Sequence, residues 1–149
     1  LESVGRDQFN QILRQHVHAP LPPGGLHYLH GLMGGFIDLV FEHQGKYFVA
    51  DYKSNHLGNT YQDYRGEQLQ SAMDQHRYDL QYLIYSLALH RYLAERIKDY
   101  RYEHHFGGVY YLFLRGMHPQ NPAGTGVYHA RPEAALIESL DRLFAGSSS

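Results

Sequence analysis

The sequence of 149 residues contains no cysteine, which excludes disulfide bonds and metal sites built from thiolates, iron–sulfur clusters included. It also lacks any run of residues long and apolar enough to cross a membrane. Its 43% of hydrophobic residues can form one domain with a core of its own. We therefore expect a single soluble domain, for which a reducing cytoplasm is a compatible location.

A basic surplus is missing as well, since the formal net charge is −2 at pH 7. Nonspecific affinity for nucleic acid comes largely from lysine and arginine contacts to phosphate. The chain alone is therefore expected to bind DNA weakly, and a tether that keeps DNA nearby would compensate for this. The motif G-x-x-x-x-G-K-[ST], which binds nucleotide phosphates, does not occur, so we expect no use of ATP by these residues.

Two β-prone runs, residues 35–41 and 46–52, are joined across Gln44 and Gly45. Glycine at the second turn position favours a tight hairpin. If the turn is centred between these two residues, the register is the same whether the loop holds two or four residues. The sequence therefore predicts both a hairpin and the pairing of its strands.

In that register Asp38 lies directly opposite Asp51, with Cβ atoms roughly 5 Å apart. Because strand side chains alternate, Lys53 shares the face of Asp51, while Tyr52 points to the other face. Two adjacent carboxylates repel each other, so a cation is expected between them. Hard oxygen ligands suit Mg²⁺, with Mn²⁺ as a possible substitute, and Lys53 would orient a water or neutralise charge in the transition state.

The pattern therefore indicates a magnesium-dependent phosphodiesterase. D-x-K on its own usually means no more than an exposed pair at the end of a strand. The opposed Asp38 on an apolar hairpin favours a site.

Residues 68–98 show a helical pattern with a bend near Tyr78 and Asp79. The buried stripe is expected to consist of apolar residues at helical spacing, namely Leu80, Leu83, Ile84 and Leu87. Arg77, Gln81 and Tyr85 lie along its flank, which can face the catalytic edge of the hairpin. Without further information, Gln81 and Tyr85 would be ordinary boundary residues of a core helix.

The remaining elements are read from periodicity and from turn residues. They are a helix at 4–15, a Pro-rich loop at 20–25, a strand at 26–33, a loop at 55–66, a central strand at 106–115, a loop at 117–126, an edge strand at 127–129 and a helix at 131–143. This order predicts an α/β domain of three layers with a mixed sheet. Tyr61 and Tyr64 in the loop are candidates for stacking on unpaired bases.

Several stretches together resemble the RecB-type nuclease domains of bacterial exodeoxyribonuclease V, which belong to the PD-(D/E)xK superfamily. The resemblance covers residues 31–144 and is carried by 34–41, 51–55, 76–82 with Tyr85, and 104–109. It implies a three-layer restriction-endonuclease-like fold with a mixed central β-sheet flanked by helices. It also implies functional roles for six residues: Asp38 and Asp51 as metal ligands, Tyr52 as a ligand through its backbone carbonyl, Lys53 as the catalytic lysine, and Gln81, with Tyr85, as the Q-x-x-x-Y element beside the active site.

The chain departs from the family pattern at two places. Ile37 replaces the proline of the superfamily's name, and a metal-binding histidine on an upstream helix has no counterpart, because His16 and His18 flank a Pro-rich loop. Residue one is Leu rather than Met, so we expect part of a longer polypeptide. It would comprise an N-terminal helix and loop at 1–25, the nuclease core at 26–145 and a flexible tail at 146–149.

The resemblance implies Mg²⁺-dependent hydrolysis of DNA phosphodiesters by the exodeoxyribonuclease module of a bacterial, cytoplasmic helicase–nuclease that repairs double-strand breaks and promotes recombination. The implied partners are single- and double-stranded DNA ends and the RecC and RecD subunits, with ATP used only by the missing helicase portion. The alternative is a catalytically silent module that positions DNA or docks a protein, with an incomplete metal site.

The twelve histidines do not form a zinc pattern, because the adjacent His104 and His105 cannot both face one site from a regular strand. His76 and Arg77 are candidates for phosphate contact.

Overall fold

The computed structural model describes residues 2–3, 39–76 and 78–146. These residues form a five-stranded sheet in the order β1-β2-β3-β4-β5. The strands are β1 (Glu2–Ser3), β2 (Leu39–His43), β3 (Lys46–Lys53), β4 (Phe106–Phe113) and β5 (Val127–Ala130). The helices are η1 (Tyr61–Tyr64), α3 (Gly66–Gln75), α4 (Tyr78–Arg96), α5 (Tyr102–His105), η2 (Leu114–Gly116) and α6 (Ala134–Gly146).

Several predictions concern residues outside the described ranges. These are the helix at 4–15, the Pro-rich loop at 20–25, the strand at 26–33, His16 and His18, and residues 147–149 of the tail predicted at 146–149, whose first residue, Gly146, ends α6.

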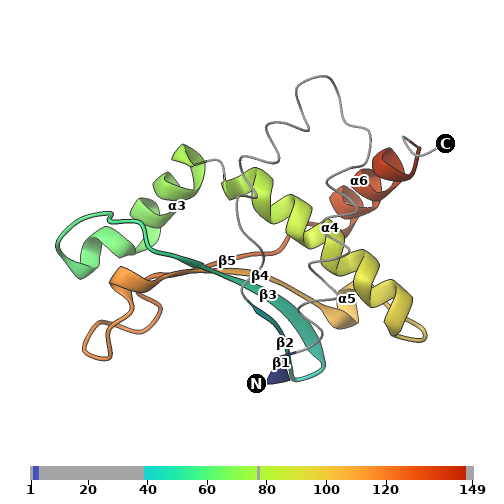
Figure 1. The fold of residues 1–149 in the computed structure, drawn as a ribbon, viewed down its shortest axis with the longest axis horizontal. Coiled ribbons are helices and arrows are strands. Elements are labelled where there is room, and N and C mark those ends of the chain that lie inside the picture. Colours follow the sequence, from blue (N-terminus) through green and yellow to red (C-terminus); the bar gives the residue numbers. More distant parts are fainter. Residues whose placement is uncertain (1, 4–38, 77, 147–149) are drawn as a thin grey trace.

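The sheet is mixed, because β3 and β4 run parallel while each other neighbouring pair is antiparallel. A parallel pair needs a crossover connection, which α3, α4 and α5 supply between β3 and β4 (Figure 1). The strand predicted at 106–115 is confirmed as β4, and the edge strand predicted at 127–129 is confirmed as β5. At the predicted bend near Tyr78, one helix ends at Gln75 and another begins at Tyr78. No helix in the described part of the chain is both long and apolar enough to span a bilayer.

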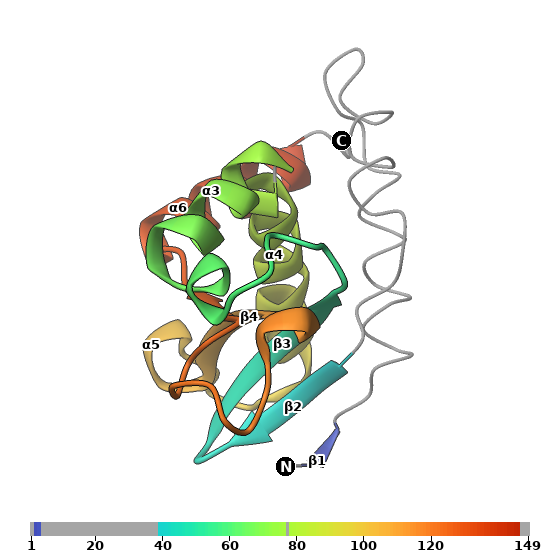
Figure 2. The same cartoon turned by 90° about the vertical axis from the view of Figure 1, so that its left-hand side faces the viewer.

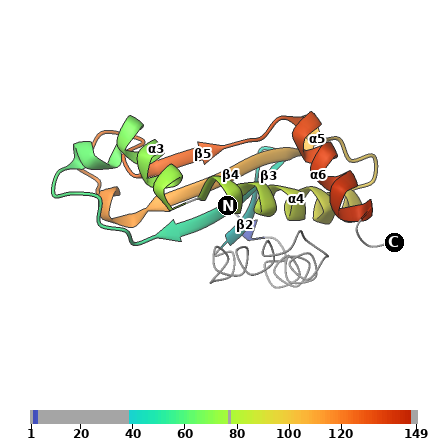
Figure 3. The ribbon, with the colours of Figure 1, turned by 90° about the horizontal axis from the view of Figure 1, so that it is seen from above.

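Helices α3, α4 and α6 lie on one face of the sheet (Figure 2), and α4 crosses β3 and β4 (Figure 3). The core between these layers consists of side chains that are almost fully buried. They include Val40, Val49, Val109, Phe113, Met73, Leu89, Leu93 and Ile137. The side chains of β3 that point to this face come from alternate residues, which is the period of two expected of a strand.

The predicted buried stripe of α4 is wrong in part. Leu87 is buried, but Leu83 and Ile84 are only half-buried, whereas Gln81 and Tyr85 are 3% and 1% exposed. The reason is that the sheet lies under the flank that carries the polar groups. Tyrosine can bury its ring while its hydroxyl finds a partner, so packing against the strands prevails over hydropathy along this helix.

Two glycines at the start of β4 allow the strands to approach closely. The register shifts between Tyr47 and Phe48, so that Gly107 is skipped in the pairing with β3. A Cβ atom on Gly107 would lie 2.4 Å from the ring of Phe48, and Gly108 has a left-handed φ of 116°. This irregularity is a β-bulge, and it requires glycine at both positions.

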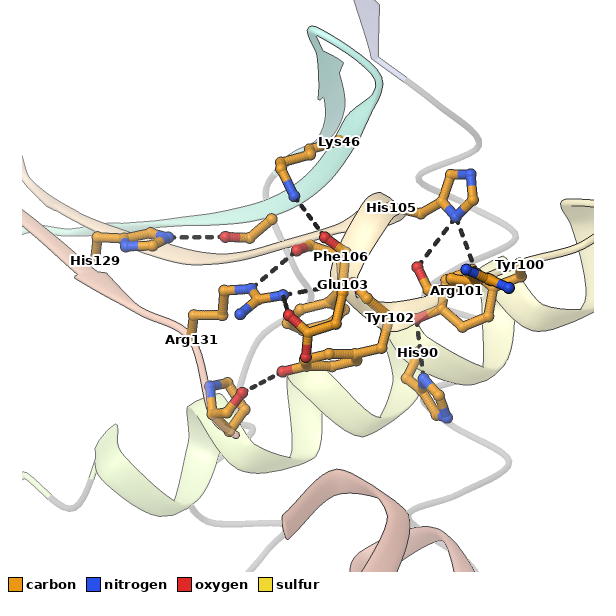
Figure 4. Close-up of polar contacts among 12 residues, drawn as sticks. Lys46, His90, Tyr100, Arg101, Tyr102, Glu103, His105, Phe106, His129 and Arg131 are labelled. Atoms are coloured by element: carbon orange, nitrogen blue, oxygen red, sulfur yellow. Dashed lines mark hydrogen bonds and ion pairs between the residues drawn. The ribbon is translucent and has the colours of Figure 1, made fainter. Parts of the chain in front are cut away.

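Polar contacts at the amino end of β4 join this strand to α5 and to the segment before α6 (Figure 4). Arg131 donates from Nε to the carbonyl of Phe106 at 3.0 Å, pairs with Glu103 at 3.3 Å and lies 4.8 Å from the ring centre of Tyr102. The Tyr102 hydroxyl donates to the carbonyl of Pro132. These contacts fix α5 and the segment before α6 at the end of the sheet opposite to the carboxyl ends of β3 and β4.

Candidate active site

The hairpin between β2 and β3 turns at Gln44 and Gly45, which have φ values of 52° and 81°. Positive φ at both central residues is the signature of a two-residue type I′ turn, whose twist matches that of the strands. The backbone N–H of Gly45 donates to Glu42 Oε1 at 3.0 Å. The predicted turn centre is therefore confirmed.

The register of this hairpin is uniform along its described length. It ends with Leu39 opposite Ala50, in agreement with the register predicted from the turn. Asp38, the predicted second carboxylate, lies outside the described residues. Its position opposite Asp51 stays a prediction, and the observed register is consistent with it.

Asp51 lies near the carboxyl end of β3 and faces the helical layer. It is 5% exposed, and its Oδ2 atom lies 2.9 Å from Nζ of Lys53. Tyr52, between them, points to the other face and is 45% exposed. The predicted alternation is therefore confirmed, and the buried carboxylate has a counter-charge two residues away.

Gln81 brings α4 into contact with this ion pair. Its Oε1 atom accepts hydrogen bonds from Nζ of Lys53 at 3.3 Å and from the hydroxyl of Tyr111 at 2.9 Å. Burial raises the pKa of Tyr111 well above its usual value, with smaller contributions from Tyr85 and Asp51. The phenol therefore stays protonated, and it holds the amide oxygen of Gln81 toward the lysine.

Two aromatic rings flank the ammonium of Lys53. Its Nζ atom lies 4.1 Å from the ring centre of Tyr78 and 5.4 Å from that of Tyr111, and the two rings are stacked 5.7 Å apart. Asn55 donates from Nδ2 to the hydroxyl of Tyr78 at 3.2 Å. Cation–π attraction therefore adds to the ion pair in fixing the ammonium group.

Sequence reasoning missed Tyr78 and Tyr111 as components of the site. Tyr78 precedes Gln81 by three residues, and this spacing places both on one helical face, so it was a usable signal. Tyr111 lies beside Asp51 only through the parallel pairing of β3 with β4. Nothing local in the sequence indicates that pairing.

Tyr85, one helical turn after Gln81, is almost fully buried in the core. It lies near enough to Tyr111 to contribute to the raised pKa of that phenol. The structure thus brings Asp51, Lys53, Gln81 and Tyr85 to one region, where β3, β4 and the first turns of α4 meet.

The donor atoms at this place have the chemistry that Mg²⁺ prefers. They are the buried carboxylate of Asp51 and the backbone carbonyl of Tyr52, both hard oxygen donors. In the ranges 39–76 and 78–146, His, Asp and Glu side chains form no group of three that could hold a metal ion. The described residues therefore fit part of a magnesium site, to which the predicted Asp38 would add a second carboxylate.

The predicted role of Tyr64 in DNA contact is wrong. It is 3% exposed, and its hydroxyl accepts from the N–H of Leu57 and donates to the carbonyl of Gly58, so it braces the loop after β3. Tyr61 is 42% exposed and stays a candidate. An aromatic residue in a polar loop gives no local sign of which side it faces.

One of the described histidines contacts a residue of the candidate site. His76 stacks on Tyr78 with ring centres 5.3 Å apart, whereas Arg77 lies outside the described residues. His104 and His105 belong to α5 rather than to a strand. His90 contacts the hydroxyl of Tyr100 at 2.9 Å, and burial lowers its pKa, more than Asp141 and Glu138 raise it.

Comparison with known proteins supports the resemblance seen in the motifs. A model of the PD-(D/E)XK nuclease superfamily matches residues 4–146. The chain is 51% identical over 147 residues to the RecBCD enzyme subunit RecB of Escherichia coli, covering 97% of this chain and 12% of that protein. It is 48% identical over 138 residues to the same subunit of Haemophilus influenzae, covering 93% and 11%.

The chain thus spans about an eighth of the length of these relatives. The predicted resemblance to RecB is confirmed. With the mixed sheet and its flanking helices, the family match also confirms the predicted restriction-endonuclease-like α/β fold.

Proposed function

The chain belongs to the PD-(D/E)XK nuclease superfamily, and on that premise we propose that Asp51, Lys53 and Gln81 form the centre of a magnesium-dependent nuclease that hydrolyses DNA phosphodiesters. One observation carries the proposal. At the carboxyl end of β3, the ammonium of Lys53 is shared between the buried carboxylate of Asp51 and the buried amide oxygen of Gln81.

The roles of the residues follow from their chemistry. Lys53 places a positive charge beside the position at which negative charge develops on phosphate during attack by water. Gln81 and the two tyrosine rings keep this charge in one place, so little reorganisation is needed when the substrate binds. Because Asp51 is buried, its carboxylate is attracted to any cation that enters the site.

Asp51 and the backbone carbonyl of Tyr52 would hold Mg²⁺ together with Asp38. When bound, Mg²⁺ supplies positive charge that stabilises the developing charge on phosphate and favours the attack of water. Because a carboxylate has two oxygen atoms, Asp51 would be able to hold Mg²⁺ while Lys53 stays paired with it.

The finer assignment rests on the relatives. Their names describe a subunit of the RecBCD enzyme, and we propose that this chain is the exodeoxyribonuclease V-type module of such an assembly. Its substrates would be DNA ends in double-strand-break repair and recombination in the bacterial cytoplasm. RecC and RecD subunits would be its partners, and ATP would be used elsewhere in the parent protein.

A second candidate is a catalytically silent module that positions DNA or docks a protein. The observation in its favour is that the described residues supply only part of a metal site. The two candidate functions differ in whether the chain cleaves a DNA phosphodiester bond. One preparation of the protein can therefore distinguish them.

The test is a cleavage assay on linear single-stranded DNA in Mg²⁺ and in Mn²⁺, combined with a metal titration. Cleavage that Asp51→Ala or Lys53→Ala abolishes supports the nuclease, provided that the matched control Lys98→Ala, at an exposed position, cleaves normally. Metal binding without cleavage in either ion supports the silent module. A chain that binds neither metal nor DNA contradicts both.

A further inference from the structure

The segments that follow β3 and β4 pack together beside the candidate active site. Residues 54–66 include η1, residues 114–126 include η2, and we call the two together the loop rim. Figure 1 shows them in green and orange at the left-hand end of the sheet. The rim is thus continuous with the strand that carries Asp51 and Lys53.

Hydrogen bonds between its two halves hold the rim in shape. The N–H of Gly126 donates to the carbonyl of Tyr64 at 2.8 Å, and Arg65 donates to Oγ1 of Thr125 at 3.0 Å. A Cβ atom on Gly116 would lie 2.4 Å from Cβ of Tyr64, so the backbones are in close contact. The surface that the rim presents is therefore preformed.

Several exposed apolar side chains belong to the rim, whose two short helices, η1 and η2, contact each other. Of the five large hydrophobic residues that are exposed in the described part of the chain, three lie in the rim: Tyr61 at 42%, Leu114 at 50% and Met117 at 42%. Tyr52, at the end of β3, is a fourth. Exposed apolar groups on neighbouring segments are typical of a binding surface, whereas the fifth residue, Leu136, lies apart on α6.

A cationic group accompanies them. Arg115 is exposed, and its Nε donates to the carbonyl of Ser54 at 2.7 Å. Ser54 directly follows Lys53, so this guanidinium is anchored to the main chain one residue after the proposed catalytic lysine. Within residues 39–76 and 78–146, Arg115 forms no ion pair.

Arg131 offers an instructive contrast at the other end of β4. It too donates from Nε to a main-chain carbonyl, that of Phe106, but its Nη2 atom pairs with Glu103 and its guanidinium lies over the Tyr102 ring (Figure 4). Arg131 thus makes contacts that hold the fold through both Nε and Nη2. Arg115 has the same kind of main-chain anchor, and within residues 39–76 and 78–146 no carboxylate pairs with its Nη groups.

We propose that the loop rim binds a single strand of DNA next to Lys53, with Arg115 on a backbone phosphate and with Tyr61, Leu114 and Met117 against the bases. This inference rests on the proposed function, because it names how the same site holds its substrate. A guanidinium anchored at Nε presents its Nη groups in the geometry that phosphate accepts.

The strand is single because a duplex keeps the faces of its bases inside the stack. Aromatic and apolar side chains bind the faces of unpaired bases without regard to sequence. Such contacts also explain how a chain with net charge −2 can hold DNA at one place while its overall electrostatic attraction is small.

The first test measures binding of fluorescein-labelled oligo(dT) to the 149-residue chain in EDTA over a series of salt concentrations. Arg115→Gln should weaken binding on the order of tenfold at low salt and reduce the slope of log K against log salt by about 0.7, the value for one phosphate on a single strand. Arg115→Lys should keep the slope. Arg101→Gln, an equal change of charge at an exposed position near the other end of the sheet, should leave both unchanged.

The second test separates bases from phosphates. Tyr61→Ala should weaken binding of oligo(dT) without a change of slope, and this loss should vanish on an abasic strand of the same length. Leu136→Ala is the control, since Leu136 is also 42% exposed and lies outside the rim. An equal loss on the abasic strand would overturn the contact with bases.

The outcomes keep the two proposals apart. If Arg115→Gln binds with the affinity and slope of Arg101→Gln, the rim does not hold the strand, whether or not the chain cleaves DNA. If the chain binds DNA through Arg115 but never cleaves it, the proposed binding of DNA by the rim is supported and the proposed hydrolysis is contradicted. If binding is too weak to measure but cleavage occurs, a raised KM for Arg115→Gln alone supports the rim and an unchanged KM overturns it.

Discussion

The ammonium of Lys53 lies 4.1 Å from the centre of the Tyr78 ring, so the first residue of α4 holds the charged group at the end of β3. Such contacts between a cation and an aromatic face contribute about 0.5–2 kcal/mol, more when water is excluded. Tyr78 is in turn held by Asn55 and by stacking on Tyr111. The lysine is therefore positioned by a ring that is itself held in place.

Replacement of Tyr78 by leucine should lower kcat about tenfold, which corresponds to the loss of roughly 1.4 kcal/mol of positioning. Tyr78→Phe keeps the ring and should keep most of the activity. The spectroscopic check is the ring-current shift of the Lys53 ε-methylene protons, which Tyr78→Leu should abolish and Tyr78→Phe should preserve. The chain has only three lysines, so Lys46 and Lys98 serve as internal references, and an unchanged Lys53 signal would contradict the prediction.

Removal of the Tyr111 hydroxyl tests the role of Gln81 Oε1, which accepts hydrogen bonds from both Tyr111 and Lys53. Tyr111→Phe leaves Gln81 Oε1 with Lys53 as its remaining donor in the hydrogen bonds described above, which should cost about 1 kcal/mol of unfolding free energy and lower kcat several-fold. The measurement is urea denaturation together with steady-state cleavage. Tyr110→Phe is the matched control, because the neighbouring residue points to the opposite face of the sheet, and equal losses in both variants would refute the assignment.

Loss of the lysine charge should make the chain depend on metal for stability. Lys53→Met leaves the buried Asp51 carboxylate without its cation and should destabilise the fold by about 3 kcal/mol in EDTA. Because Mg²⁺ binds only the folded site, it should restore part of the lost free energy of unfolding. It should therefore raise the Tm of Lys53→Met more than the Tm of the wild type. Asp51→Asn should show no such response, and a Tm of Lys53→Met that ignores Mg²⁺ would argue against metal binding at Asp51.

The lowered pKa of His90 predicts a loss of stability in mild acid. Burial, the largest cause, lowers this pKa below its usual 6.5 in the folded state, so the unfolded chain binds a proton that the folded chain does not. The free energy of unfolding should therefore fall as the pH drops through about 6.5 and stop falling below the folded pKa. The urea midpoint measured against pH should vary less for His90→Gln than for the wild type, and parallel curves would count against this explanation.

The catalytic tripeptide and its hairpin could be predicted because their determinants are local. Gln44 and Gly45 fix the turn, the turn fixes the register, and strand alternation places Asp51 and Lys53 on one face. These three steps need no information from the rest of the chain.

The surroundings of the tripeptide could not be predicted in the same way. Tyr111 reaches Asp51 through a parallel pairing across a long crossover, and the more buried flank of α4 is decided by the sheet beneath it. The burial of Tyr64 could not be predicted because its partners are backbone atoms of its own loop. In each case a contact distant in sequence or hidden in a loop decides which way a side chain points.

The break between α3, which ends at Gln75, and α4, which begins at Tyr78, makes the active centre sensitive to fraying. The first turn of a helix lacks intrahelical partners for its N–H groups and opens more readily than the middle. Tyr78 and Gln81 both belong to that first turn, so an opening of a single turn would release Lys53 while the sheet stayed intact. Hydrogen exchange of the amides one turn later, which donate to the carbonyls of this first turn, would then report the lifetime of the ordered site, and a ligand that slows this exchange stabilises the whole centre.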